Sequence, residues 1–226
     1  ITSSNTNAPA GTLAKPLDVI TLSITADNNI QTPTITIAGN AAIIATGADD
    51  ESVYTATYEM LPTDATADVI AFTVDFLDLA GNEGVQVVAW TVDDVNGGVS
   101  FDKQAPSFET VSIASNNLVS TGDDDNGTRA KVGDVITVTL VSDEDLKTGL
   151  DPTVTIAGNT AVVTRTGIVG STNTFTATYT MSDDTDELRN GFFIPINISN
   201  YFDPAGNEGD EETDTNDGSE VIFDAI

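Results

Sequence analysis

Residues 33–40 read PTITIAGN, and residues 152–159 read PTVTIAGN. In each stretch an apolar residue alternates with threonine, and the run ends in a Gly-Asn pair. Alternation with a period of two predicts a half-buried β-strand, and Gly-Asn is a strong turn signal. Because the same strand and turn occur twice, the sequence contains two copies of one β-rich unit, as an array or polymer protein does.

The repetition extends over most of the chain. Residues 54–58 (YTATY) return as residues 175–179 (FTATY), and residues 78–84 (DLAGNEG) return as residues 203–209 (DPAGNEG). Strands are also predicted at residues 19–25, 69–76, 85–91, 107–115, 135–140, 192–198 and 221–223. Pro195 falls inside one of them, which predicts an edge position or a bulge there.

Many short strands separated by turns, without an amphipathic helical pattern, are typical of β-sandwiches. The boundary between the copies is predicted near residues 101–106 (FDKQAP). We therefore expect an all-β chain of two tandem sandwich domains, residues 1–102 and residues 103–226. The first strand of the first domain is expected to be incomplete.

The charge of the chain excludes several partners. Its net charge is −29, with only seven Lys and Arg residues. Phosphate backbones and anionic membrane surfaces need clustered basic residues, so nucleic acid is not an expected partner and neither is an anionic membrane surface. No apolar run reaches the length of a membrane span. A hydrophobic fraction of 39% nevertheless indicates a folded chain.

The chain has neither Cys nor His, which removes disulfides, thiol chemistry and the commonest general base. It also has no nucleophile-elbow or phosphate-binding motif. We therefore expect no enzymatic activity. Of the 36 acidic residues, 26 are Asp and 10 are Glu. Asp favours loops over helices, and its carboxylate is a good ligand for hard cations.

Together with the repeats above, the segments FDKQAP (residues 101–106), VSIASNN (residues 111–117) and AKVGDVITVT (residues 130–139) resemble the bacterial immunoglobulin-like tandem repeats of large secreted surface proteins. The resemblance covers nearly the whole chain. It implies immunoglobulin-like domains, a secreted or cell-surface location, and a structural role in adhesins, surface layers or extracellular fibres. It also implies rigidification by calcium.

Calcium ligands are predicted in three acidic regions. The first is the loop GDDDNG at residues 122–127, where Asp123, Asp125 and Asn126 offer oxygen ligands and the glycines let the backbone fold around an ion. The alternative for this loop is a solvated acidic surface. The second region is the run at residues 210–217, with Asp214 and Asp217 as candidate ligands, although acidic runs are commonly solvated.

The third region combines loops that a sandwich can bring to one end of the domain. Its candidate ligands are Asp102, Asp143, Glu144, Asp145, Asp203 and Asn207, with Asp27 and Asp78 at matching positions of the first copy. Clustered carboxylates repel one another unless a cation bridges them. The alternative for the Asp-x-Ala-Gly-Asn motif is a turn in which the Asp side chain bonds the backbone, and this interpretation is slightly favoured.

The sequence thus predicts a non-enzymatic extracellular structural protein, a calcium-stabilised subunit of a filament or surface assembly. Head-to-tail copies are expected to associate by strand complementation at the incomplete first strand, which would give an open filament. Excision from a longer array is the alternative explanation of that strand. A spacer of an adhesin stalk and a module that binds glycans or host surfaces remain alternative functions. The glycan alternative needs an exposed aromatic cluster, which the sequence does not indicate.

Overall fold

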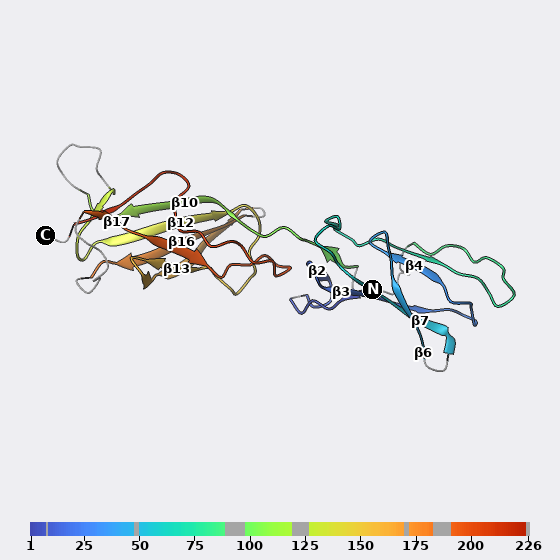
Figure 1. Ribbon diagram of the computed structural model, residues 1–226. Helices are drawn as coiled ribbons and strands as arrows, with labels where there is room; N and C mark the ends of the chain where they lie inside the picture. The colour runs from blue at the N-terminus through green and yellow to red at the C-terminus, as the bar shows by residue number, and fades with distance from the viewer. Residues whose placement is uncertain are drawn as a thin grey trace. The chain divides into compact units, whose positions relative to one another are not determined.

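The computed structural model describes residues 1–7, 9–47, 50–88, 98–118, 127–169, 172–182 and 191–224. These residues form strands and turns but no helix, so the all-β prediction is confirmed for them. The chain divides into two compact units, Ile1–Gln104 and Ala105–Ile226, each with its own core (Figure 1). Nowhere in the described residues is there a helix long and apolar enough to cross a membrane.

The first unit is built from three small sheets. A four-stranded sheet has the order β1 (Thr2–Ser3), β3 (Val19–Thr25), β7 (Asp50–Glu59), β6 (Ile43–Gly47). A three-stranded sheet has the order β5 (Asn40–Ala41), β4 (Thr34–Ile37), β8 (Phe72–Asp75). The short strands β2 (Leu13–Ala14) and β9 (Ser100–Phe101) pair in parallel. Inward side chains from all three sheets form the core.

The second unit repeats the larger sheets. Its four-stranded sheet has the order β10 (Phe108–Ser115), β12 (Val135–Ser142), β16 (Thr172–Thr180), β15 (Val162–Val169). One three-stranded sheet has the order β14 (Asn159–Thr160), β13 (Thr153–Ile156), β18 (Ile196–Ser199). Another has the order β11 (Arg129–Ala130), β19 (Ile222–Phe223), β17 (Phe192–Phe193). This layering around one core is consistent with a β-sandwich.

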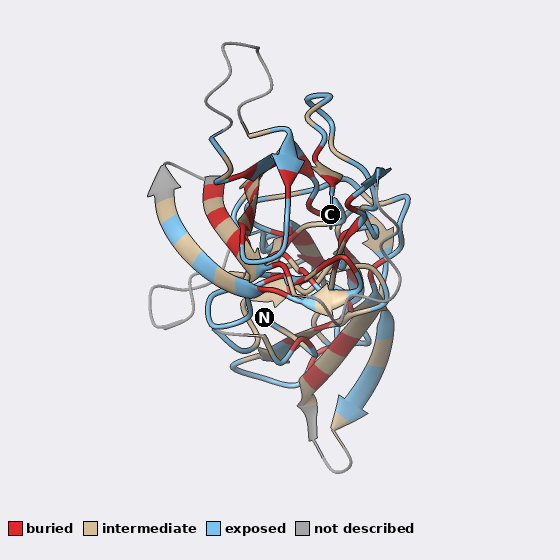
Figure 2. Ribbon diagram, turned by 90° about the vertical axis from the view of Figure 1, so that its left-hand side faces the viewer, coloured by how far each residue is buried: buried red, intermediate tan, exposed pale blue. Residues whose placement is uncertain are grey.

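The alternating pattern read from the sequence places alternate side chains of each strand in the core. Along β12, Ile136, Val138 and Leu140 are fully buried, whereas Thr137 and Thr139 are half-buried on the other face. Figure 2 shows this banding of buried and less buried residues along the longer strands. The aromatic residue of the FTATY repeat, Phe175, is also fully buried. The period-two prediction is therefore confirmed in these strands.

The repeated IAGN segments are two-residue hairpins. Ile156 of β13 pairs with Asn159 of β14, and the two residues between them, Ala157 and Gly158, have φ of 54° and 74°. Positive φ at both loop positions is the geometry of a tight type I′ hairpin. The turn therefore lies at Ala-Gly rather than at the Gly-Asn pair that the sequence indicated. The side-chain amide of Asn159 donates to the carbonyl oxygen of Ala157 at 2.9 Å and helps to close the loop.

The predicted strand at residues 192–198 is in fact two strands in different sheets. Phe192 and Phe193 belong to β17 and pair with β19, whereas the chain from Ile196 onward belongs to β18 and pairs with β13. Pro195 lies exposed at the crossing between them. Proline cannot donate to a sheet ladder, which explains why the strand is interrupted there.

A tight turn before β3 holds a residue in an unfavourable backbone conformation. Leu17 has φ of 74° and is exposed, and the equivalent position before β12 is Gly133, with φ of 89°. Both backbone N–H groups make the same bond, to the carbonyl oxygen of Met60 or of Met181, at 2.8 Å. The turn therefore imposes a left-handed conformation in both units, and glycine tolerates that conformation better than leucine.

We expect Leu17→Gly to stabilise the first unit by up to about 1 kcal/mol, because relief of the left-handed strain exceeds the entropy that glycine adds to the unfolded chain. Gly133→Ala should have the opposite effect on the second unit, a loss of about 1 kcal/mol. Urea unfolding followed by circular dichroism measures both changes. A destabilised Leu17→Gly variant would contradict the prediction.

Candidate metal centre

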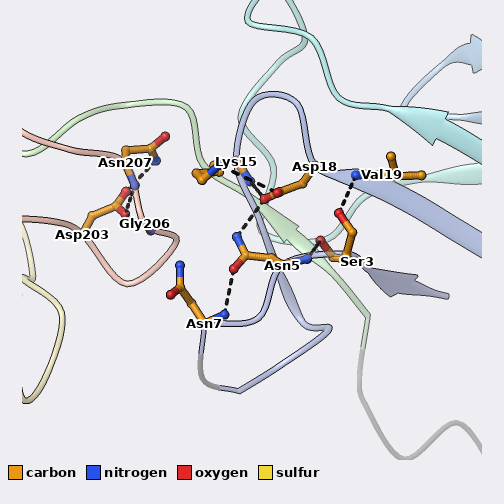
Figure 3. A network of polar contacts seen from close by, with 10 residues as sticks. Ser3, Asn5, Asn7, Lys15, Asp18, Val19, Asp203, Gly206 and Asn207 are labelled. Carbon is orange, nitrogen blue, oxygen red and sulfur yellow. Dashed lines mark hydrogen bonds and ion pairs between the residues drawn. The ribbon is translucent and has the colours of Figure 1, made fainter.

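The buried Asp203 holds the Asp-x-Ala-Gly-Asn turn of the second unit. Its carboxylate accepts hydrogen bonds from the backbone N–H of Gly206 at 2.5 Å and of Asn207 at 2.8 Å. The side-chain amide of Asn207 donates to the same carboxylate at 2.7 Å (Figure 3). The turn interpretation of this motif is therefore confirmed, and these bonds fix the orientation of the Asp203 carboxylate.

The first unit has the same turn at its surface. Asp78 accepts hydrogen bonds from the backbone N–H of Asn82 at 2.8 Å and from its side-chain amide at 2.7 Å. The side-chain bond from Asn82, followed by the backbone bond, lowers the pKa of Asp78 below its usual value. Asp203 is 0% exposed, whereas Asp78 is only half-buried, so the shared motif occupies two different environments.

A second acidic side chain lies beside Asp203. The loop after β12 brings a carboxylate oxygen of Glu144 within 4.8 Å of a carboxylate oxygen of Asp203. The hydroxyl of the buried Ser142 donates to the backbone carbonyl oxygen of Glu144 at 2.5 Å and so holds the loop against the unit. Two like charges at this separation, one of them buried, repel each other strongly unless a cation or a proton neutralises them.

The other two acids of the same loop point elsewhere. Asp143 accepts hydrogen bonds from the backbone N–H of Ser107 at 2.8 Å and from its hydroxyl at 2.7 Å. Asp145 accepts a hydrogen bond from the side-chain amide of Asn173 at 3.1 Å. Of the three consecutive acids Asp143, Glu144 and Asp145, only Glu144 is thus paired with Asp203.

Negative charge dominates this part of the second unit. The pKa of Tyr201, two residues before Asp203, is raised to about 12, first by burial and then by the charges of Glu212, Asp210 and Asp143. Desolvation and nearby anions both disfavour the phenolate. The same negative potential favours a bound cation. Carboxylates are acceptors only, and oxygen ligands of this kind suit Ca²⁺.

Several other predicted ligands can be described within their own units. Asp27 and Asp214 are exposed, and Asp102 belongs to the first unit, where it accepts a hydrogen bond from the backbone N–H of Gln104 at 3.0 Å. Asp217 accepts bonds from the hydroxyl and backbone N–H of Ser219, which lower its pKa. Asp123, Asp125 and Asn126 lie outside the described residues. Their role as ligands stays a prediction.

Sequence reasoning missed a buried polar cluster that occurs in both units. Asp134 accepts hydrogen bonds from the backbone N–H of Lys131 at 2.8 Å, from the ammonium of Lys131 at 3.0 Å and from the side-chain amide of Asn117 at 2.6 Å. Burial raises the pKa of Asp134, but these bonds outweigh burial and the pKa lies below its usual value.

The first unit builds the same cluster around Asp18. Its carboxylate accepts hydrogen bonds from the backbone N–H of Lys15 at 2.8 Å and from the side-chain amide of Asn5 at 2.7 Å (Figure 3). The sequence signal was the repeated Lys-x-x-Asp spacing, Lys15 to Asp18 and Lys131 to Asp134. The cluster closes a turn in each unit, so Asp18 and Asp134 have a structural role that requires no metal.

The acidic run at residues 210–217 also has a structural task that the sequence did not reveal. The side chain of Asn216 accepts from the backbone N–H of Val111 at 2.7 Å and donates to the carbonyl oxygen of Phe108 at 2.9 Å. The hydroxyl of Ser219 accepts from the backbone N–H of Ile113 at 2.8 Å. Uncharged side chains of this segment thus cover the outer edge of β10, which protects it from pairing with other chains.

No protein-family model matches the chain, and no curated protein is detectably similar to it in sequence. The Glu144 and Asp203 pair is the arrangement that best suits a ligand of defined chemistry, a hard divalent cation.

Proposed function

We propose that this chain is a non-enzymatic structural protein of the cell surface, made of two immunoglobulin-like domains of which the second is stabilised by Ca²⁺. The carboxylate pair of Glu144 and Asp203 carries the proposal, because it places a buried negative charge next to a second one. A divalent cation would convert their repulsion into an attraction and would link the β12 loop to the Asp203 turn.

The hydrogen bonds around Asp203 support this role. Its carboxylate is held by Gly206 and Asn207, so it would lose little conformational freedom when an ion binds. Ca²⁺ takes about six to eight oxygen ligands. Glu144 and Asp203 would supply the carboxylate ligands, and carbonyl oxygens and water would supply the others.

A mechanical role fits the way the polar residues are used. Hydrogen bonds of Asp18 and Asp134 each close a turn, and those of Asn216 hold a strand edge. Such contacts make each unit resistant to local opening. We propose that the chain acts in a filament, surface layer or adhesin stalk, and that its partners are copies of itself or neighbouring immunoglobulin-like domains.

One feature favours a glycan-binding alternative. Phe192 and Phe193 of β17 are 59% and 55% exposed, an aromatic pair that the sequence did not indicate. Successive residues of a strand point to opposite faces, so the two rings do not form one stacking platform. The structural function is therefore the better supported of the two.

Calcium should raise the thermal stability of the second unit. At a free concentration about 100 times the dissociation constant, a ligand specific to the folded state adds about 2.7 kcal/mol to the free energy of unfolding. Differential scanning calorimetry with Ca²⁺, with Mg²⁺ and with chelator measures the effect. We expect Glu144→Gln to abolish the calcium-dependent shift, because it removes one of the two carboxylates.

Glu208→Gln is the matched control, since Glu208 is exposed and next to the same turn. It removes the same charge and should keep the full shift. An identical unfolding temperature of the unmodified chain with Ca²⁺ and with chelator would refute calcium stabilisation. A shift that survives in Glu144→Gln would place the ion elsewhere.

A further inference from the structure

The central strands of the four-stranded sheet of the second unit carry no charged residue on their outer face, although the chain carries a net charge of −29. On the central strands β12 and β16, every outward position from Val135 to Val141 and from Thr174 to Thr180 is threonine or valine. Neighbouring positions on β10 and β15 continue this surface with Thr, Ser, Ala and Val. The exposed Glu109 lies beside this surface, at the register shift near the start of the edge strand β10.

The strand register arranges these residues in rows. Thr139 pairs with Thr176, and Thr176 pairs with Thr164 of the edge strand. The next row joins Thr137, Thr178 and Val162 in the same way. Strands lie about 4.8 Å apart, so methyl and hydroxyl groups form a continuous, nearly flat surface. We call this surface the threonine face.

The first unit has a related face, which differs in carrying one acid, the exposed Glu59 of β7, opposite Val19. Thr21 pairs with Thr57, which pairs with Ile43 of the edge strand β6. Ile43 occupies the position that Val162 has in the second unit, and the two side chains are 77% and 69% exposed. Their sequence neighbours Ile44 and Val163 pack against the cores, so Ile43 and Val162 are directed outward. An exposed β-branched aliphatic residue thus recurs at one place on both faces.

Electrostatics indicates which partner this face fits. Two copies with net charges of −29 repel over most of their surfaces. Contact through the threonine face of the second unit opposes no carboxylates of the central strands β12 and β16, buries methyl groups and the side chain of Val162, and lets threonine hydroxyls bond to one another. A basic partner would meet acids elsewhere on the chain and would not be drawn to an uncharged face. A second copy of this chain is therefore the occupant that the face fits.

We propose that the threonine face is a self-association surface, through which two copies pack sheet against sheet in a symmetric contact. This proposal deepens the proposed structural function, on which it rests, by assigning the surface for lateral assembly. A four-stranded face of this length covers about 500 Å² at standard strand spacings. Stable complexes bury about 800 Å² per partner, so the contact is weak and depends on high local concentration.

Sedimentation velocity over a range of protein concentrations tests the proposal, at low and high NaCl and with either Ca²⁺ or chelator. Salt screens the repulsion between the acidic copies, so we expect the dimer fraction to rise with NaCl. An interface based on opposite charges would weaken instead. The double variant Ile43→Glu/Val162→Glu should remain monomeric under all these conditions, because it places charges on both faces.

The control is Leu79→Glu/Leu150→Glu, which adds the same charge at exposed aliphatic residues in loops. It should associate as the unmodified chain does, and circular dichroism verifies that both variants are folded. A chain that stays monomeric throughout, or equal association of the two variants, would overturn the proposal. Glu144→Gln separates the two ideas: it should keep self-association while losing calcium stabilisation, and Ile43→Glu/Val162→Glu should do the reverse.

Discussion

Replacing Asp203 with alanine should destabilise the second unit by about 3 kcal/mol, because two backbone N–H groups and one side-chain amide lose their acceptor in a buried turn. The equivalent change in the first unit, Asp78→Ala, removes the same kind of bonds from a more exposed turn. Water can replace the lost acceptor there, so we expect a much smaller effect.

Differential scanning calorimetry of both variants in chelator measures the losses, and amide hydrogen exchange assigns each loss to its unit. Working without calcium keeps the contribution of the turn separate from any loss of a bound ion. Equal destabilisation by Asp203→Ala and Asp78→Ala would show that burial does not determine the strength of this turn. Asp203→Asn retains one acceptor oxygen and relieves repulsion with Glu144, so its loss should lie below that of Asp203→Ala.

The alternation of apolar and polar residues predicted the positions of the main strands reliably. β12 and β16 lie where alternation predicted them, because one face of each strand must be apolar to enter the core. The prediction was wrong where a short stretch of sequence was compatible with two different strand arrangements. Pro195 separates two strands of different sheets instead of sitting at an edge or bulge, and a run of six or seven residues cannot reveal which partner each half will pair with.

The acidic residues were harder to interpret than the strands. The sequence does not distinguish the three consecutive acids at residues 143–145. In the structure Asp143 binds Ser107, Glu144 lies beside Asp203, and Asp145 binds Asn173. Their directions depend on how the loop packs against distant segments. The threonine face, in contrast, was present in the sequence as Thr137, Thr139, Thr176 and Thr178. Its meaning emerges only when the register aligns these residues and shows that no charge lies among them.

Gly209→Ala should also destabilise the second unit by about 3 kcal/mol. A Cβ atom added to Gly209 would lie 1.9 Å from Cε2 and 2.4 Å from Cζ of Tyr201. The Tyr201 ring is 1% exposed, its centroid is 4.6 Å from that of Phe108, and its hydroxyl donates to the carbonyl oxygen of Asp210. The ring cannot move aside without breaking these contacts, and overpacking a fixed core group costs about 1–3 kcal/mol or more.

Gly84→Ala in the first unit provides the comparison. Its added Cβ would lie 2.2 Å from the ring of Phe76, the residue equivalent to Tyr201. Phe76 is only half-buried and has no hydroxyl to lose, so its ring can rotate toward solvent at a cost of about 1 kcal/mol. Urea unfolding of each variant measures the difference. If the mobility of the ring determines the cost, Tyr201→Leu should remove most of the penalty of Gly209→Ala in a double-mutant cycle. A fully additive cycle would contradict this explanation, because the ring would then not be what requires glycine there.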